Sequence, residues 1–128
     1  MITDKFPIVK DDANETPIPS EWRGTLSDIV GALKDGDYKV NRKINGVCPV
    51  PDDIADIIAE NLATYGGHLV GLPEEAWDTS VCQWMDDYWD LLIDLYTLEE
   101  GASDLVLSVR VYESGASYVF DIQLVYVP

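Results

Sequence analysis

Basic residues are almost absent from the last two thirds of the chain. The 128 residues contain 8 Lys+Arg against 24 Asp+Glu, a formal net charge of −16. Residues 1–45 are nearly balanced, whereas residues 46–128 contain Arg110 as their only Lys or Arg. Phosphate binding and attachment to an anionic membrane surface both require clustered basic side chains. The sequence therefore predicts that the protein binds neither nucleic acid nor membrane, and it favours a cationic partner.

Long apolar runs and cysteine motifs are also missing. No segment has the length of a membrane-spanning helix, and the first residues do not form a basic segment followed by an apolar stretch. We therefore expect neither a transmembrane segment nor a signal peptide. The two cysteines, Cys48 and Cys82, have no metal-binding or redox spacing. We expect reduced thiols in a cytoplasmic protein.

Catalytic and metal-binding motifs are scarce. His68 is the only histidine, and there is no G-x-S-x-G nucleophile motif, EF-hand loop or phosphate-binding glycine loop. Adjacent acid pairs are plentiful, but in so acidic a chain we expect them mostly in solvent. The sequence thus predicts a non-catalytic protein with no cofactor and no metal. Two alternatives stay open: a small enzyme with a cleft near His68 and Cys82, and an acidic solubilising or scaffold domain.

Residues 1–128 have the length of one domain. Prolines punctuate residues 1–19, which we expect to form an extended N-terminal arm. Apolar spacing predicts a first helix from Ser20, with Ser20 as its cap, to Lys34. It also predicts a second helix after Pro51 that ends at Gly66. Asn45-Gly46 between these helices is typical of a two-residue turn, which favours a short hairpin.

The C-terminal third alternates between apolar and mixed positions, as antiparallel strands with one buried face do. This pattern predicts strands over 89–96, 104–112 and 117–127, with the odd-numbered face of the first two buried. Residues 80–88 fit a helix or a strand, and we favour the strand because it extends the sheet. The predicted fold class is α+β: an antiparallel C-terminal meander of three to four strands, with two helices packed on one face. In the second helix the predicted apolar face is Ile54, Ile57, Ile58, Leu62 and Tyr65, and in the last strand it is Tyr118, Phe120, Ile122, Leu124 and Tyr126.

The mixed face of this sheet is the candidate binding site. Exposed tyrosines among charged residues are typical anchors of protein interfaces. In the alternative interpretation, Tyr96 and Tyr112 simply pair with each other across two strands. The predicted partner-binding residues on the face and on the surrounding turns are Asp86, Asp87, Asp90, Asp94, Tyr96, Glu99, Glu100, Tyr112 and Asp121.

Four segments of the C-terminal half carry a resemblance to a known class of proteins: GLPEEAW, WDLLIDLYT, EEGASDLVLSV and the closing LVYVP. Over residues 67–128 the chain resembles small bacterial immunity proteins of contact-dependent inhibition and related polymorphic toxin systems. This resemblance implies a cytoplasmic protein that binds a cognate toxin and blocks it. Many such toxins are basic nucleases, which would suit an acidic partner. The resemblance does not identify the toxin, and the oligomeric state stays open.

Overall fold

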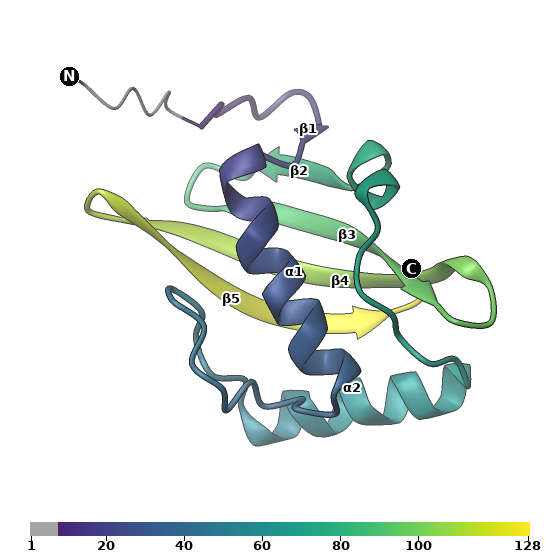
Figure 1. Cartoon of the computed structure of the whole chain (residues 1–128). Helices are drawn as coiled ribbons and strands as arrows, with labels where there is room; N and C mark the ends of the chain where they lie inside the picture. Colours follow the sequence, from purple (N-terminus) through teal and green to yellow (C-terminus); the bar gives the residue numbers. More distant parts are fainter. Residues whose placement is uncertain (1–7) are drawn as a thin grey trace.

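Two helices and one antiparallel sheet form the fold (Figure 1). The computed structural model describes residues 8–128. The predicted α+β class is confirmed, and the sheet has five strands in the order β1-β2-β3-β4-β5, one more than expected. The elements are β1 (Thr16–Pro17), α1 (Ser20–Lys34), α2 (Asp52–Tyr65), the 3-10 helix η1 (Glu74–Asp78), β2 (Val81–Trp84), β3 (Trp89–Thr97), β4 (Gly101–Ser114) and β5 (Ser117–Tyr126).

The additional strand comes from the N-terminal arm. β1 pairs with the start of β2, with Thr16 opposite Cys82 and Pro17 opposite Val81. Further contacts hold the arm: Trp89 Nε1 donates a hydrogen bond to the carbonyl oxygen of Val9 (2.9 Å). A strand of two residues has no periodicity that a sequence could show. The arm predicted over residues 1–19 thus adds an edge strand; its first seven residues lie outside the described part of the chain.

α1 covers one face of the sheet (Figure 1). Its buried residues, Trp22, Leu26, Ile29, Val30, Ala32 and Leu33, recur at helical spacing and join the main core. The predicted cap at Ser20 is wrong. Ser20 is already the first helical residue, Pro19 stands at the cap position, and no side-chain hydrogen bond caps the helix.

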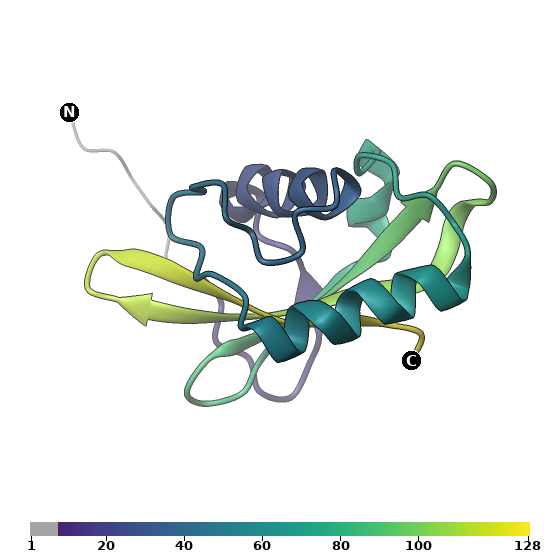
Figure 2. The ribbon, with the colours of Figure 1, turned by 90° about the horizontal axis from the view of Figure 1, so that it is seen from below.

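α2 packs along β5 at the edge of the sheet (Figure 2). Asn61 Nδ2 donates to the carbonyl oxygen of Val125 (2.8 Å), which satisfies one backbone group at this edge. Gly66 ends the helix in the left-handed conformation, at φ 83°. The predicted apolar face was too wide, because Ile57 is 43% exposed. A helix at a sheet edge buries a narrower stripe, here Ala55, Ile58 and Leu62.

The alternation in β3 and β4 is confirmed. Trp89, Leu91, Ile93 and Leu95 of β3 are buried, as are Leu105, Leu107, Val109 and Val111 of β4. The prediction for the end of β5 is wrong. Ser108 of β4 pairs with Leu124 of β5, but the next residue, Val109, pairs with Ile122. The residue of β5 between Ile122 and Leu124 therefore has no partner and forms a β-bulge. Beyond this bulge Val125 is buried instead of Leu124 and Tyr126.

The predicted hairpin at Asn45-Gly46 is also wrong. The turn itself is present, with Gly46 at φ 80° and Val47 N bonded to the carbonyl oxygen of Ile44 (3.1 Å). However, the segments on either side of the turn form no pair of strands, and a single backbone hydrogen bond beyond the turn, from Val50 N to the carbonyl oxygen of Lys39 (2.9 Å), joins them. Phe120 N donates to the carbonyl oxygen of Gly46, and Cys48 N donates to that of Phe120. The turn therefore protects the outer edge of β5.

Gly67 lies where the chain between α2 and η1 passes close to β3. A Cβ atom at this position would lie 2.9 Å from Thr97 Cγ2, and Thr97 is buried. We expect Gly67→Ala to lower the free energy of unfolding by about 1–3 kcal/mol. The matched control is Gly24→Ala in α1, where nothing lies within 4 Å of the added methyl group. It should stabilise by about 0.5–1 kcal/mol. Urea unfolding measures both, and equal effects would contradict the close approach.

Candidate partner-binding face

Among residues 8–128, no helix lies over one face of the sheet. α1 lies over the opposite face and α2 lies along the β5 edge, which Figure 2 shows from below. Most side chains on this open face are half-buried. The described part of the N-terminal arm reaches its β2 edge, where Gln83 Nε2 donates to the carbonyl oxygen of Asp11 (3.3 Å). By register, the open face comprises Val81, Gln83, Asp90, Leu92, Asp94, Tyr96, Val106, Ser108, Arg110, Tyr112, Val119, Asp121, Leu124 and Tyr126.

All five sequence-predicted residues within the strands lie on this face: Asp90, Asp94, Tyr96, Tyr112 and Asp121. The alternative in which Tyr96 and Tyr112 pair with each other is wrong. The β3–β4 turn sets Thr97 opposite Gly101, so Tyr96 faces Ala102, far along β4 from Tyr112. The two tyrosines therefore define two different ends of the open face.

The Tyr112 end contains its own cation. Tyr112 contacts Tyr88, with ring centroids 5.5 Å apart, and the Arg110 guanidinium lies 4.5 Å from the Tyr88 ring centroid. Register places Arg110 between Asp90 and Asp121 on the neighbouring strands. Burial raises the pKa of Asp90, and the charge of Arg110 counteracts part of that increase. The only base of residues 46–128 thus compensates the acids at this end. Tyr88 was not predicted as a site residue.

The Tyr96 end holds carboxylates that form no ion pair among residues 8–128. Burial raises the pKa of Tyr96, and the charges of Glu75, Asp94 and Asp78 raise it further. Two of these acids come from η1, which Ser80 fixes against β3. Ser80 Oγ donates to the carbonyl oxygen of Ala76 (2.7 Å) and accepts from Asp94 N (3.0 Å). Sequence reasoning missed Glu75 and Asp78, because a tertiary contact brings them to the sheet.

The predicted turn acids lie at opposite ends of β3. Asp86 and Asp87 form the β2–β3 turn, and among residues 8–128 no side-chain hydrogen bond or ion pair involves either carboxylate. The other pair, Glu99 and Glu100, is hydrogen-bonded to residues of the protein itself. Glu99 accepts from His68 N (2.8 Å) and contacts His68 Nδ1 (2.6 Å), while Glu100 accepts from Tyr65 Oη. These bonds fasten the β3–β4 turn to the end of α2.

Glu99 provides a test of that attachment by pH. Its hydrogen bonds to His68 lower its pKa from 4.5 to about 2. A lowered pKa in the folded state contributes stability above pH 4.5, and this contribution is lost as pH falls toward 2. We expect Glu99→Gln to lower the melting temperature at neutral pH, with the difference from wild type disappearing near pH 2. Glu74→Gln, on exposed η1, is the control. A Glu99 carboxyl that titrates near its ordinary value by NMR would contradict this arrangement.

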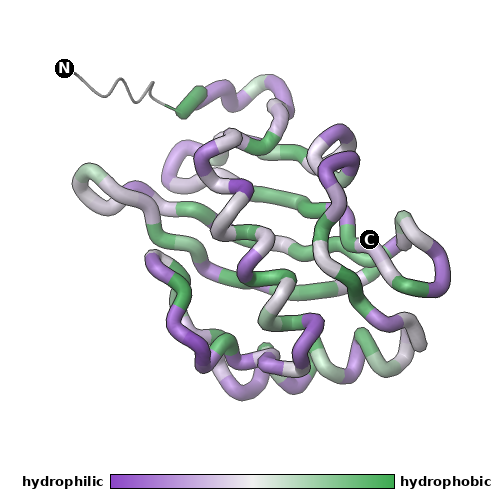
Figure 3. Tube along the Cα trace, in the orientation of Figure 1, coloured by the Kyte–Doolittle hydropathy of each residue, from purple (hydrophilic) through white to green (hydrophobic). Residues whose placement is uncertain are grey.

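Apart from Arg110, the basic residues that form ion pairs among residues 8–128 lie away from the open face. Lys39 pairs with Asp52, Arg42 pairs with Asp35 and Asp37, and Lys10 pairs with Glu113. Most of these pairs lie in the segment that joins α1 and α2, where Figure 3 shows hydrophilic residues gathered beside the hydrophobic strands. The charge asymmetry along the sequence therefore becomes an asymmetry in space.

Cys82 and His68, the residues of the alternative enzyme site, differ in their surroundings, because the first is buried and the second is at the surface. Cys82 is 1% exposed on the core side of β2, and burial raises its pKa to about 11. His68 is at the surface, with its side chain 80% exposed. Within residues 8–128, no group of three or more His, Cys, Asp or Glu side chains is placed to hold a metal ion. No helix in that part of the chain has the length and apolar character needed to cross a membrane.

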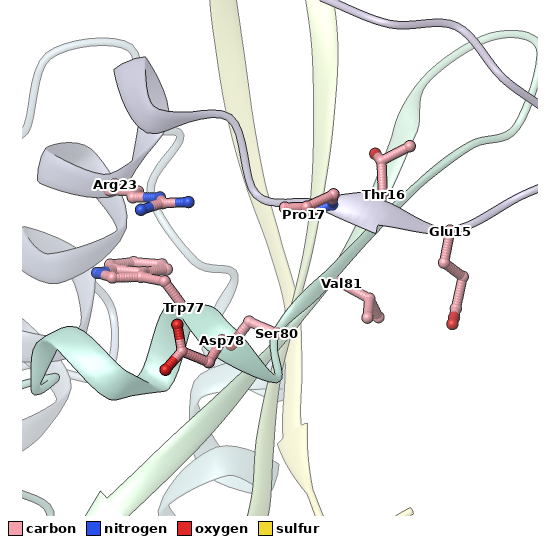
Figure 4. A pocket seen from close by; sticks show the side chains of 8 residues that line it. All are labelled: Glu15, Thr16, Pro17, Arg23, Trp77, Asp78, Ser80 and Val81. Atoms are coloured by element: carbon pink, nitrogen blue, oxygen red, sulfur yellow. The ribbon is translucent and has the colours of Figure 1, made fainter.

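A pocket of about 530 Å³ lies at the β1 side of the sheet, between the N-terminal arm and η1 (Figure 4). Arg23 lies over Trp77, with its guanidinium carbon 5.5 Å from the ring centroid, and donates from Nε and Nη2 to the carbonyl oxygen of Ile18. Asp78 of η1 and Val81, which lies on the open face by register, are both part of the pocket lining.

Comparison with curated proteins finds no match, and comparison with solved structures finds none either. A family model does match, over residues 30–128, which comprise the last turn of α1 and every later element. The match covers more than half of the chain. The protein therefore belongs to the family described as Domain of unknown function (DUF7668).

Proposed function

We propose that the protein is a non-catalytic, cytoplasmic immunity or inhibitor protein that binds a basic protein, a cognate toxin domain, and neutralises it by occlusion. The observation that carries the proposal is the open face of the sheet. It combines half-buried tyrosines with carboxylates, no helix of residues 8–128 covers it, and the bases of the described chain other than Arg110 lie elsewhere. Aromatic anchors surrounded by charge are the chemistry of protein interfaces.

The charge distribution supports a basic partner over an uncharged one. An acidic surface attracts cationic partners over a distance set by salt, and this attraction increases the rate of association. It also disfavours a second copy of the same chain, since two such surfaces repel each other. The thiols support binding over a thiolate-based reaction, because burial raises the pKa of both Cys48 and Cys82.

The test is affinity capture from the source cells with the intact protein, followed by reconstitution with the purified captured chain. We expect that chain to be basic and to lose its own activity at one equivalent of this protein. Capture of acidic or neutral chains only, or full activity of the captured chain within the complex, would contradict the proposal.

A further inference from the structure

The Tyr112 end and the Tyr96 end of the open face differ in how far a cation of the protein compensates their carboxylates. At the Tyr112 end, Arg110 already lies against Tyr88 and between two carboxylates. At the Tyr96 end, Arg23 lines a pocket together with Asp78, but its guanidinium donates to the carbonyl oxygen of Ile18 and forms no ion pair with a carboxylate of residues 8–128. Among residues 8–128, the ion pairs and cation–π contacts include neither Tyr96 nor the carboxylates of Glu75, Asp78 and Asp94.

Hydrogen bonds also hold the backbone of the Tyr96 end in place. Val70 N donates to the carbonyl oxygen of Tyr96 (3.0 Å), so β3 is paired at this residue. Ser80, 3% exposed, ties η1 to Asp94 by the hydrogen bond described above. The backbone of η1 is therefore held beside β3 before any partner arrives, which lowers the entropic cost of association.

A pocket of about 530 Å³ beside η1 has room for a long side chain. Asp78 is the residue that it shares with the Tyr96 end, and Val81, which also lines it, faces Leu92 on the open face. Within the pocket, Arg23 on Trp77 shows that this surface holds a guanidinium against an aromatic ring (Figure 4). Two carboxylates, Glu15 and Asp78, line the pocket against this single guanidinium.

We infer that the Tyr96 end of the open face, formed by Tyr96, Asp94, Glu75 and Asp78, is the docking surface for an arginine- or lysine-bearing segment of the protein partner. The inference rests on the proposed function and specifies where the contact is made. A partner cation lies over the Tyr96 ring among the three carboxylates, as Arg110 lies over Tyr88 beside Asp90 at the other end. The Tyr112 end, whose cation is internal, contributes shape but little charge.

The test uses a capped hexa-arginine peptide as a probe, titrated into isotope-labelled full-length protein and followed by NMR. The largest chemical-shift changes are expected at Tyr96, Asp94 and η1. Tyr96→Leu should weaken peptide binding roughly two- to fivefold, whereas Tyr96→Phe, which keeps the ring, should retain most of it. Asp94→Asn should also weaken binding by roughly two- to fivefold, and the matched control Asp121→Asn, on the same face, should have little effect.

Four results would overturn the inference. The first is a shift map centred on Tyr112 and Asp121 or on the acids of α2. The second is an equal effect of Asp94→Asn and Asp121→Asn. The third is a wild-type protein that self-associates in sedimentation velocity and becomes monomeric with Tyr96→Leu, since a second copy would then occupy the surface. A captured basic partner that binds Tyr96→Leu and Asp94→Asn as tightly as wild type would also overturn it, yet leave the proposed function standing.

Discussion

Trp22→Ala is expected to lower the free energy of unfolding by about 3–5 kcal/mol, a large part of the roughly 5–15 kcal/mol of a typical domain. Trp22 is 2% exposed and joins α1 to the sheet. Its ring packs edge-on against Trp89, Tyr118 and Phe120, at centroid distances of 5.3, 5.2 and 6.0 Å. An alanine would remove these contacts and leave a cavity between the two layers.

The matched control is Trp22→Phe. It keeps an aromatic ring in the cluster and removes Trp22 Nε1, a buried donor without a hydrogen-bond partner among the described residues. We therefore expect a smaller loss than with alanine. Urea unfolding followed by circular dichroism is the suitable measurement, because urea does not screen the charge of −16 as a guanidinium salt would. Equal urea midpoints for Trp22→Ala and wild type would contradict the role of this cluster.

The second large effect concerns association with the captured basic partner. We expect the association rate to fall by about tenfold or more between low and high salt, because electrostatic steering raises such rates by roughly 10- to 1000-fold. The screening length falls from about 30 Å at about 0.01 M salt to about 3 Å at about 1 M. Surface plasmon resonance at several salt concentrations measures this dependence.

The turn acids allow the charge effect to be separated from stability. Asp87→Lys should lower the association rate while leaving the melting temperature nearly unchanged. Asp86 has φ 74°, a left-handed conformation that Asn tolerates and Lys does not, so Asp86→Asn is the appropriate change there. Charge reversal at Glu99 or Glu100 would also break the bonds to His68 and Tyr65. An association rate that responds neither to salt nor to Asp87→Lys would make the acidity a solubility feature.

Periodicity was sufficient to predict the centre of the fold. Strict alternation fixed which faces of β3 and β4 are buried, because side chains of a strand alternate whatever the strand pairs with. The bulge in β5 depends on how β5 pairs with Ser108 and Val109 of β4, and the sequence of β5 alone does not contain this information. The turn at Gly46 was predicted, but its pairing with Phe120 was not, because that partner is distant in sequence.

For the candidate site too, the sequence pattern predicted one part and tertiary contacts determine the rest. Alternation placed Tyr96 and Tyr112 on one face, yet only the structure separates them and gives each its neighbours. Glu75 and Asp78 reach Tyr96 through the contact of η1 with β3, and Glu99 and Glu100 are occupied by residues at the end of α2. Composition predicted the sign of the partner's charge. Tertiary contacts determine which carboxylates are free to meet it.

Methyl cross-saturation NMR of the complex with the captured partner tests most directly whether the open face binds. The signals of Leu92, Leu124 and Val81, which are half-buried on that face, should lose intensity when the partner is saturated. The signal of Ile57, 43% exposed on α2, should be unchanged. Attenuation of Ile57 with unaffected Leu92, Leu124 and Val81 would place the partner on the helices and contradict the account.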